Sequence, residues 1–359
     1  MLKELLISMP MMVCFFWSIF FLIRCWKSDE EKGVKGTITV FFIVATILYL
    51  DHWLFFSGHV YTAGEWSYGV VNLCVYPIYY AYLRALTRAK LSWEVPVLLI
   101  PAAMAIILFP IGQFTGLLTD AQTFLIIRIC FTIQVIWVLI RGYQLLIRTI
   151  RRMDNTYSDD RSRLLLPTRI SLVLFGITSV VSMILNFIGR ESFAHEAPIA
   201  IPAIIMSSLL FGLGYVAAHT IIPQETVEPE NAGEKEHAMR ATTAEADELI
   251  HKIGTIMREQ QLFADPHLTI QDLATAIGSN RTYVSNCINS CTGYSFSQYV
   301  ARYRVEHAQQ ILCNPKYTSD KTAIADAILL SGFSSKQTFY RIFKDVTGFT
   351  PLQFRQKKG

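Results

Sequence analysis

Charged side chains are scarce in this chain. Asp, Glu, Lys and Arg make up 17% of its 359 residues, whereas 52% are hydrophobic, and the mean hydropathy is +0.35. Because soluble domains carry about 25% charged residues, this scarcity excludes a chain that is soluble throughout. The deficit is uneven. Nearly all the long apolar runs lie before residue 222, and the remaining residues have the composition of an ordinary soluble domain.

The sequence also lacks the groups of cysteines that are typical of metal sites and disulfide frameworks. Cys287 and Cys291 are four residues apart, but no histidine lies at metal-ligand spacing from them. This pattern argues against a disulfide framework and a metal site. The sequence has no cluster typical of catalysis either, so we expect no catalytic residue, no metal, no cofactor and no enzyme activity. We interpret all seven cysteines as reduced: Cys14, Cys25, Cys74, Cys130, Cys287, Cys291 and Cys313.

Long apolar runs fill the first 222 residues. A helix needs about 20 mostly apolar residues to cross a membrane, because each residue adds about 1.5 Å across a core of about 30 Å. One such run can be a buried core helix, but seven in succession with short polar joints favour a membrane bundle. The predicted spans are Leu6–Ile23, Thr37–Phe56, Tyr68–Leu83, Trp93–Ile111, Ala121–Ile140, Thr168–Ile188 and Ala197–Thr220, and the third is the least hydrophobic.

Basic residues are nearly absent from every second joint between these spans. Ser57–Ser67 and Gly112–Asp120 contain none, and Gly189–Glu196 contains only Arg190. Cytoplasmic loops collect Lys and Arg, so we predict an N-terminus outside and a C-terminus in the cytoplasm. The other joints hold the basic residues Arg24, Lys27, Lys32, Lys35, Arg84, Arg88, Lys90, Arg141, Arg148, Arg151, Arg152, Arg161 and Arg163. We interpret the first run as a retained helix, because no small-residue cleavage site follows it.

One pattern occurs twice in the last hundred residues. It starts at Ile270 and reaches Gly278 in the first copy, and it starts at Ile324 and reaches Gly332 in the second. Each copy then continues through a helical stretch to a Thr-Gly pair. A short helix, a glycine-containing turn and a second helix make a helix-turn-helix, whose second helix can enter a DNA major groove. The repeat therefore predicts two such units in tandem.

Charge divides the second half of the chain. Residues 223–262 contain nine acidic and four basic residues, whereas residues 263–359 contain eleven basic and six acidic residues. A polar, acidic segment is typical of a solvated tether, and a basic head suits phosphate binding. We therefore predict a membrane domain at 1–222, a polar acidic linker at 223–243 and a DNA-binding domain at 244–359.

Local signals outline the helices of this second half. Thr269 with Asp272 three residues later predicts a capped helix start. Gly278 permits the following turn, and Ser279 is expected to cap the next helix. The predicted recognition helices are Asn280–Cys291 and Ser335–Val346, and the predicted linking helix is Phe296–Leu312, along which Arg302 and Arg304 count as polar positions.

Polar side chains remain on the face of each recognition helix that the core does not use. An ordinary solvated face is the alternative, but the duplicated motif favours contact with double-stranded DNA. Gln, Asn and Arg can pair with base edges, and basic residues near helix ends hold phosphates. The predicted DNA-binding residues are Arg281, Thr282, Ser285 and Asn286 in the first unit, and Lys336, Gln337, Thr338, Tyr340, Arg341 and Lys344 in the second.

Residues from about Leu249 to Arg355 resemble the DNA-binding domain of the AraC/XylS family of bacterial transcription regulators. The match rests on three stretches, which are Leu268–Ala274, Ala301–Leu312, and Gly332–Lys344 together with Thr347–Arg355. The resemblance implies promoter binding, most often with activation, and it implies RNA polymerase as a partner of an activator. It also implies that all the predicted residues except Arg281 and Lys344 read bases.

The first unit departs from the commonest family pattern. Asn286 and Asn289 stand where the family often has Arg and Lys. We therefore expect the second unit to dominate affinity and the first to tune specificity.

Two ionisable residues inside the predicted spans mark the membrane domain. Asp51 and Arg128 both fall in the half of the bilayer near the outer face, and charged groups inside spans are costly and often functional. A structural ion pair, two snorkelling side chains and a signal-binding site all remain open. Tyr79, Tyr80 and His52, together with Asn186, are candidates for a polar lining.

The combined prediction is an all-α protein in which a seven-helix transmembrane bundle precedes a cytoplasmic tandem helix-turn-helix domain. It is expected in the bacterial cytoplasmic membrane as a multi-pass, sequence-specific DNA-binding regulator that couples a signal at the membrane or outer face to promoter binding. Its expected partners are DNA, the lipid bilayer and an unknown ligand or membrane protein, and a homodimer stays open. The alternative is a membrane transporter, or a sensor of other function, with an accessory DNA-binding tail.

Overall fold

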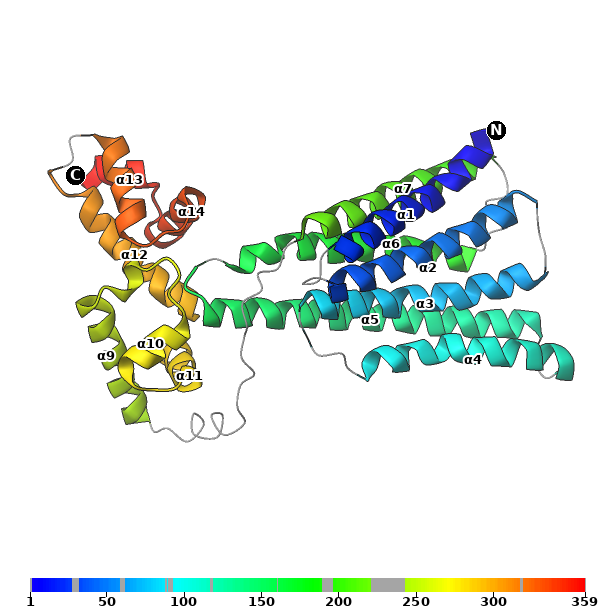
Figure 1. Ribbon diagram of the computed structural model, residues 1–359, viewed down its shortest axis with the longest axis horizontal. Coiled ribbons are helices and arrows are strands. Elements are labelled where there is room, and N and C mark those ends of the chain that lie inside the picture. Colours follow the sequence, from blue (N-terminus) through cyan, green and yellow to red (C-terminus); the bar gives the residue numbers. More distant parts are fainter. Residues whose placement is uncertain are drawn as a thin grey trace. The chain divides into compact units, whose positions relative to one another are not determined.

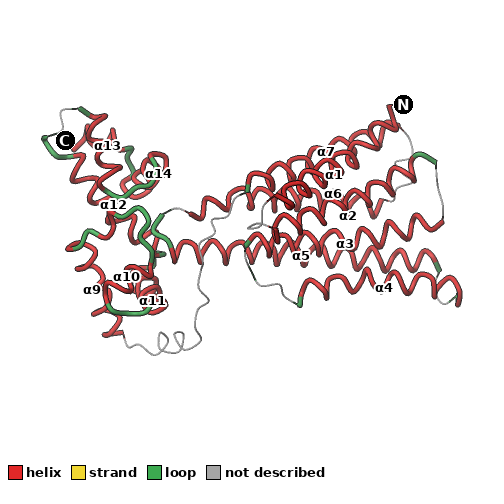
Figure 2. The backbone as a smooth tube through the Cα atoms, viewed as in Figure 1, coloured by secondary structure: helices red, strands yellow, loops and turns green. Residues whose placement is uncertain are grey.

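The computed structural model describes residues 2–27, 32–58, 62–87, 89, 93–116, 119–159, 161–188, 196–220, 243–316 and 319–358. Within them the regular secondary structure is helical and no strand forms (Figure 2), which confirms the predicted all-α class. Nearly all of the predicted linker lies outside the described residues. The chain divides into two compact units, which are residues 1–147 with 164–222, and residues 148–163 with 223–359.

The first unit is a bundle of long helices (Figure 1). Consecutive helices pack side by side from the first to the fourth, and the seventh helix contacts both the sixth and the first. The helices are α1 (Leu2–Lys27), α2 (Lys32–Phe56), α3 (Thr62–Leu86), α4 (Glu94–Thr115), the first part of α5 (Asp120–Thr156), α6 (Leu166–Ile188) and α7 (Glu196–His219).

Six of these helices are long and apolar enough to cross a membrane, and α3 is the exception among the described residues. The prediction of seven spans is therefore supported at six positions. The difference at α3 has a physical reason. Its polar and aromatic side chains, among them Asn72, Tyr76 and Tyr79, are buried against other parts of the protein. A helix surrounded by protein does not need the hydropathy that contact with lipid demands.

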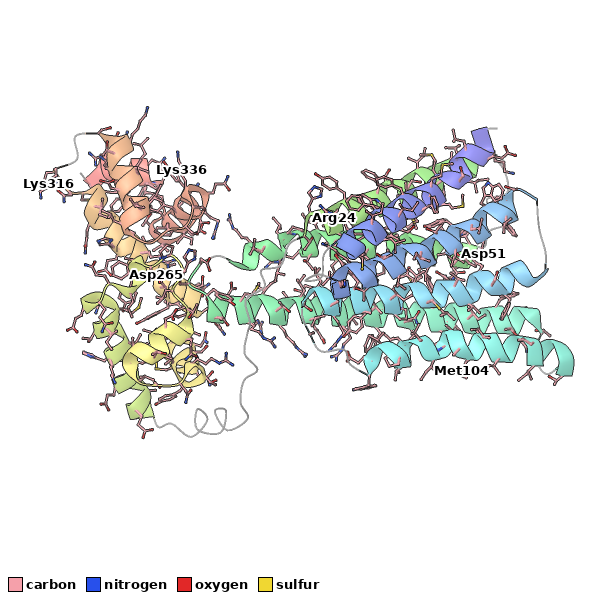
Figure 3. All side chains as sticks on the ribbon, in the orientation of Figure 1. Arg24, Asp51, Met104, Asp265, Lys316 and Lys336 are labelled. Atoms are coloured by element: carbon pink, nitrogen blue, oxygen red, sulfur yellow. The ribbon has the colours of Figure 1, made fainter. Side chains whose placement is uncertain are left out.

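The outward faces of the other helices are apolar. On α4, Met104 (labelled in Figure 3), Ile106 and Ile107 expose about half of their surface or more. Contiguous exposed apolar side chains are rare on soluble proteins and typical of surfaces that meet lipid or a partner. The first compact unit is therefore suited to a membrane by its apolar outer surface as well as by the length of its helices.

Helix α5 differs most from its prediction. The expected span ended at Ile140 and was followed by a loop, but the helix continues to Thr156. Between Tyr143 and Thr156 the sequence contains neither Gly nor Pro, so nothing ends the helix where the apolar run stops. Residues 148–163, which we assigned to a loop of the membrane domain, belong to the second compact unit.

The second unit contains the tandem repeat. Its linking helix was predicted at Phe296–Leu312, and the structure confirms those bounds. The 3-10 helix η1 (Arg161–Leu165) crosses the boundary between the two compact units. The other described elements of the second unit are α9 (Thr243–Glu259), the 3-10 helix η3 (Leu262–Ala264), α10 (Ile270–Ile277), α11 (Arg281–Thr292), α12 (Phe296–Leu312), α13 (Asp320–Leu330), α14 (Lys336–Thr347) and α15 (Pro351–Lys358).

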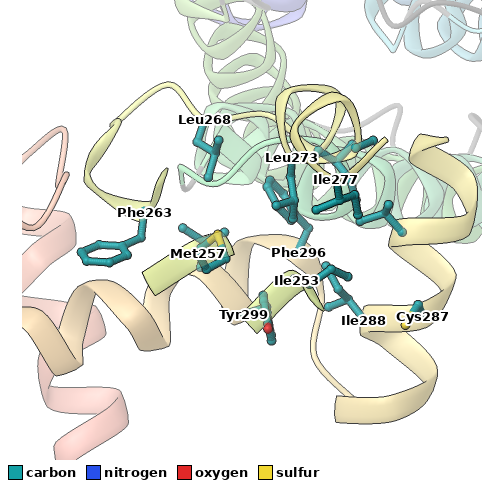
Figure 4. Close-up of a cluster of buried hydrophobic side chains, with 14 residues drawn as sticks. Ile253, Met257, Phe263, Leu268, Leu273, Ile277, Cys287, Ile288, Phe296 and Tyr299 are labelled. Atoms are coloured by element: carbon teal, nitrogen blue, oxygen red, sulfur yellow. The ribbon is translucent and has the colours of Figure 1, made fainter. Parts of the chain in front are cut away.

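Two small hydrophobic cores hold this unit together. The first joins α9, α10, α11 and the start of α12, with Ile253, Leu273 and Ile288 fully buried in it (Figure 4). The second joins the end of α12 to α13, α14 and α15, around Phe339 and Phe343. Each core lies beneath one helix-turn-helix, and α12 contributes to both, so this one helix fixes the two units relative to each other.

Candidate nucleic-acid interface

Both recognition helices, α11 and α14, begin and end on strong local signals. The side chain of Asn280 accepts a hydrogen bond from the backbone N–H of Tyr283, and Ser335 caps α14 in the same way through Thr338. Both helices end at a glycine in the left-handed region, where φ is 72° at Gly293 and 78° at Gly348. The predicted cap at Ser279 is wrong by one residue, because Gly278 and Ser279 are used by the turn.

The start of α10 forms as predicted. Thr269 and Asp272 make a reciprocal capping box, in which each side chain accepts a hydrogen bond from the other residue's backbone N–H. Such a cap satisfies donors that the first helical turn leaves without partners. It fixes where the first helix-turn-helix begins, and it leaves Thr269 at the edge of the unit.

The exposed face of α14 carries the residues expected to meet DNA. Lys336, Gln337 and Lys344 are exposed, while Thr338, Tyr340 and Arg341 are partly buried. The ammonium of Lys336 lies 5.7 Å from the centre of the Tyr340 ring. Arg341 forms an ion pair of 3.2 Å with Asp345, one turn along the same helix. This face combines base-reading and phosphate-binding chemistry over three helical turns.

Helix α11 offers fewer accessible groups. Asn286 is exposed, and Arg281 and Ser285 are partly buried. Thr282 was predicted to face DNA, but only 7% of its surface is exposed. It follows Arg281 in the first turn of the helix and lies on the side that packs inward, which the polarity of its hydroxyl does not reveal. The first helix-turn-helix therefore presents three of its four predicted DNA-binding residues at the protein surface.

Arg304 is a second residue whose burial differs from the prediction. We expected a polar position on the linking helix, but Arg304 is only 3% exposed. Its guanidinium donates hydrogen bonds to the carbonyl oxygens of Phe263 at 2.8 Å, Asp265 at 2.7 Å and Ser158 at 3.1 Å, and to Ser158 Oγ at 2.8 Å. Burial lowers the pKa of Arg304 to about 10, while the carboxylates of Asp159 and Asp265 oppose that shift.

A signal for this burial was present in the sequence. Val300, Arg304 and Ala308 follow one another at intervals of four residues, and the buried face of α12 contains all three. A basic residue in the middle of an apolar stripe is expected to be a buried, hydrogen-bonded group, because a charge is rarely buried without partners. The carbonyl oxygens that satisfy it come from distant parts of the chain and were not predictable.

The turn of the second helix-turn-helix packs tightly against the part of the domain that holds the first one. Gly332 has a φ of 74°, and a Cβ atom there would lie 2.4 Å from the carbonyl oxygen of Phe263. The equivalent Gly278 has a φ of 69° but open space around it. The second glycine is therefore required both by the turn and by the close approach of η3. This contact, together with α12, keeps the two helix-turn-helix units in register.

In the first compact unit, which contains the long apolar helices, Asp51 accepts a hydrogen bond of 3.2 Å from Ser67 Oγ. This bond joins α2 to α3. Arg128 is partly buried on α5, and its pairing with Asp51 stays a prediction. A cavity of about 100 Å³ lies beside this region, with His52, Tyr68 and Ser182 in its lining. His52 and Tyr68 contact edge to face, with 4.7 Å between ring centres.

The other residues proposed for a polar lining do not all gather there. Tyr79 shares a hydrogen bond of 3.0 Å with Ser171, and Tyr80 donates one of 2.7 Å to Glu94. The lining residues of the cavity are Ile7, Pro10, Leu48, Tyr49, His52, Phe56, Tyr68, Ser182, Leu185, Pro202, Ala203 and Met206, so it includes His52 but not Tyr79, Tyr80 or Asn186.

A buried carboxylate that the sequence analysis did not predict joins three helices. Glu94, at the start of α4, pairs with Arg84 of α3 at 3.1 Å and also with Arg141 of α5. Tyr80 completes this cluster. Two arginines on one buried carboxylate compensate its desolvation, so the cluster acts as a structural tie where the apolar runs end.

Comparison with known proteins finds a family match within the second compact unit. Residues 273–357 match the family model described as a helix-turn-helix domain. A transcriptional regulatory protein of Bacillus subtilis (strain 168), YesN, is 35% identical over 136 residues, which cover 36% of this chain and 36% of YesN. An HTH-type transcriptional regulator of the same organism, YisR, is 32% identical over 89 residues, or 24% of this chain and 29% of YisR.

A further relative is an HTH-type transcriptional regulator of Staphylococcus aureus, 30% identical over 104 residues that cover 29% of this chain and 13% of the relative. The chain thus spans about a third or less of the curated relatives it matches. No solved structure matches it. The C-terminal unit is a helix-turn-helix DNA-binding domain, and its resemblance to AraC/XylS regulators is confirmed by these matches.

Proposed function

We propose that this protein is a transcription regulator anchored in the bacterial cytoplasmic membrane, which binds specific double-stranded DNA and couples that binding to a signal at the membrane or its outer face. One observation carries the proposal. A helix-turn-helix domain with an exposed polar recognition face belongs to the same chain as six helices long and apolar enough to cross a membrane.

The DNA contacts follow from the chemistry of the exposed face. Gln337 and Arg341 have the geometry for base edges, and Lys344 suits a phosphate. The first helix-turn-helix contributes further DNA contacts through Arg281, Ser285 and Asn286. Because α12 holds both units together, one protomer can present its recognition helices to successive major grooves, which are about 34 Å apart on one side of the duplex.

The orientation follows from the basic joints. Arg84 at the end of α3, and Arg148 and Arg151 in the last turns of α5, lie at ends that the positive-inside rule assigns to the cytoplasm. That arrangement puts the helix-turn-helix domain in the compartment that contains DNA. RNA polymerase is the partner expected of an activator, and a second copy of the chain would extend the site.

The signal site that we propose is the outer half of the first unit, around Asp51 and Arg128. Support comes from the neighbouring cavity, because His52 of its lining is the next residue to Asp51. A carboxylate beside a ring-lined cavity can respond to a ligand through charge or hydrogen bonding.

DNA binding by the full chain tests the function. The protein is purified in lipid nanodiscs and exposed to a pool of random duplexes, and bound sequences are selected over several rounds. We expect one enriched motif, and an affinity for it whose logarithm falls linearly with the logarithm of salt concentration. Recovery of no motif, with no salt-sensitive binding at low ionic strength, would remove the proposal.

A further inference from the structure

The end of α5 reaches beyond the length that a membrane requires. Its 37 residues correspond to about 55 Å at 1.5 Å per residue, whereas the hydrocarbon core measures about 30 Å. Residues 148–159, which we call the α5 arm, belong to the same compact unit as the helix-turn-helix domain. The residues of α5 are therefore divided between the two compact units, with 120–147 in the first and 148–156 in the second.

The arm is joined to the unit by backbone pairing. Tyr157 forms an isolated antiparallel bridge with Thr269, and the N–H of Ser158 donates a hydrogen bond of 3.0 Å to the carbonyl oxygen of Leu268. Tyr157 and Ser158 are only 6% and 3% exposed. These contacts fall on the two residues that lead into α10, at the start of the first helix-turn-helix.

Arg304 holds the arm from the other side. Two of its four hydrogen bonds go to Ser158, one to the carbonyl oxygen and one to Oγ, and the other two go to η3 and the turn after it. Arg304 is part of α12, the helix that joins the two helix-turn-helix units. A displacement of the arm would therefore break hydrogen bonds to α12, the helix that sets the spacing of the recognition helices.

The arm also brings an acidic group to the side of the domain that carries the recognition helix α14. Asp154 lines a polar cavity of about 330 Å³ that is shared with Arg302 of α12 and with Arg341 and Asp345 of α14. Tyr294 and Ser295, which follow α11, complete the same lining. The cavity therefore lies between the two helix-turn-helix units, beside a residue proposed to contact DNA.

A DNA backbone that approaches this place would meet Asp154. Phosphates and carboxylates are both anions, so they repel each other and compete for the same arginines. The arm also occupies space next to α14. Its backbone contacts are few, and a small number of hydrogen bonds at a surface can open without unfolding the unit.

We propose that the α5 arm is an autoinhibitory element, which in its docked position opposes DNA binding and which is released when a signal shifts α5. This proposal rests on the proposed function, because it presumes that the second unit binds DNA. It adds a mechanism by which the first compact unit could regulate DNA binding by the second. The coupling passes through one helix, and the two states are arm docked on Arg304 and arm free.

Variants of the full chain in nanodiscs test the proposal. Ser158→Pro removes the N–H that pairs with Leu268, and Asp154→Asn removes the charge from the cavity. Each is expected to tighten binding to the selected DNA, by about tenfold for Ser158→Pro, within the range of ordinary allosteric coupling. Glu259→Gln is the matched control, because Glu259 is an exposed acid at the end of α9 and lies outside the cavity lining.

A disulfide can hold the arm in place. Tyr157→Cys combined with Thr269→Cys places two thiols at directly opposed positions of the antiparallel bridge. Under oxidation this variant is expected to lose DNA binding, and a reductant is expected to restore it, whereas Thr269→Cys alone should respond to neither treatment.

The outcomes separate the two hypotheses. Unchanged or weaker DNA binding by both Ser158→Pro and Asp154→Asn, or full binding by the oxidised double-cysteine variant, overturns the autoinhibitory arm and leaves the proposed function intact. If neither the wild type nor any reduced variant binds DNA in a salt-sensitive way, the proposed function itself has failed.

Discussion

Gln337 and Lys344 lie on the same exposed face of α14, but they suit different parts of a DNA duplex. Gln337 is in the first turn, where an amide can pair with a base edge. Lys344 is in the last turn, where it can reach a phosphate. We expect Gln337→Ala to relax the preference at one or two base pairs by about 1–3 kcal/mol. Lys344→Ala should weaken binding to all sequences equally and lower the salt slope by about one.

Titration of a panel of mutated sites at several salt concentrations distinguishes these effects. The wild type measured on the same panel is the reference. Equal, sequence-independent losses for Gln337→Ala and Lys344→Ala would mean that α14 does not read bases.

Asp51 and Arg128 give a second prediction at the scale of residues. If they are partners inside the bundle, Asp51→Asn or Arg128→Gln leaves one charge in an apolar setting, so each single change should lower stability or the response to a signal. The exchange Asp51→Arg with Arg128→Asp should recover part of that loss. Thermal unfolding of the detergent-solubilised protein measures the effect, and a double exchange no better than the singles shows that the residues are not a pair.

At the scale of elements, the turn before α14 carries the most demanding packing. Gly332→Ala adds a Cβ 2.4 Å from the carbonyl oxygen of Phe263, in a left-handed backbone conformation. We expect α13 and α14 to be destabilised by about 2–4 kcal/mol, from the conformational cost and the clash together. Hydrogen exchange of the amides in α13 and α14 of the full chain measures the loss.

Gly278→Ala is the control for that prediction. It has the same backbone conformation, with a φ of 69°, but no neighbouring atom near the added Cβ. Its cost should be limited to about 1–2 kcal/mol. Equal effects of the two substitutions would show that the approach of η3 to the second turn contributes nothing to stability.

For the whole molecule, the test concerns orientation. The alternation of basic and uncharged joints predicts that the C-terminus is cytoplasmic. Alkaline phosphatase fused after Gly359, which is active only outside the cytoplasm, should therefore be inactive, and a cytoplasmic fluorescent reporter at the same place should be active. The full chain should also sediment with the cytoplasmic membrane. Strong phosphatase activity would reverse the proposed topology.

Local pattern determined much of this molecule. Apolar runs of a given length predict helices long enough for a membrane. Among the long helices that the structure describes in the first compact unit, α3 alone falls short, and its polar side chains are buried against protein. The repeat predicted both recognition helices, although the first is capped by Asn280 and not by the expected Ser279. These features depend on near neighbours in sequence, and so a sequence alone is enough for them.

Contacts between distant residues were decided by the tertiary structure alone. Arg304 meets Ser158 across 146 positions of the chain, and no local pattern specifies which carbonyl oxygens will satisfy a buried guanidinium. The burial of Thr282 and the approach of η3 to Gly332 depend in the same way on how whole elements pack. Nor did the sequence show that α5 continues past its apolar run to join the DNA-binding unit, because a helix ends where its hydrogen bonds end and not where its hydrophobicity does.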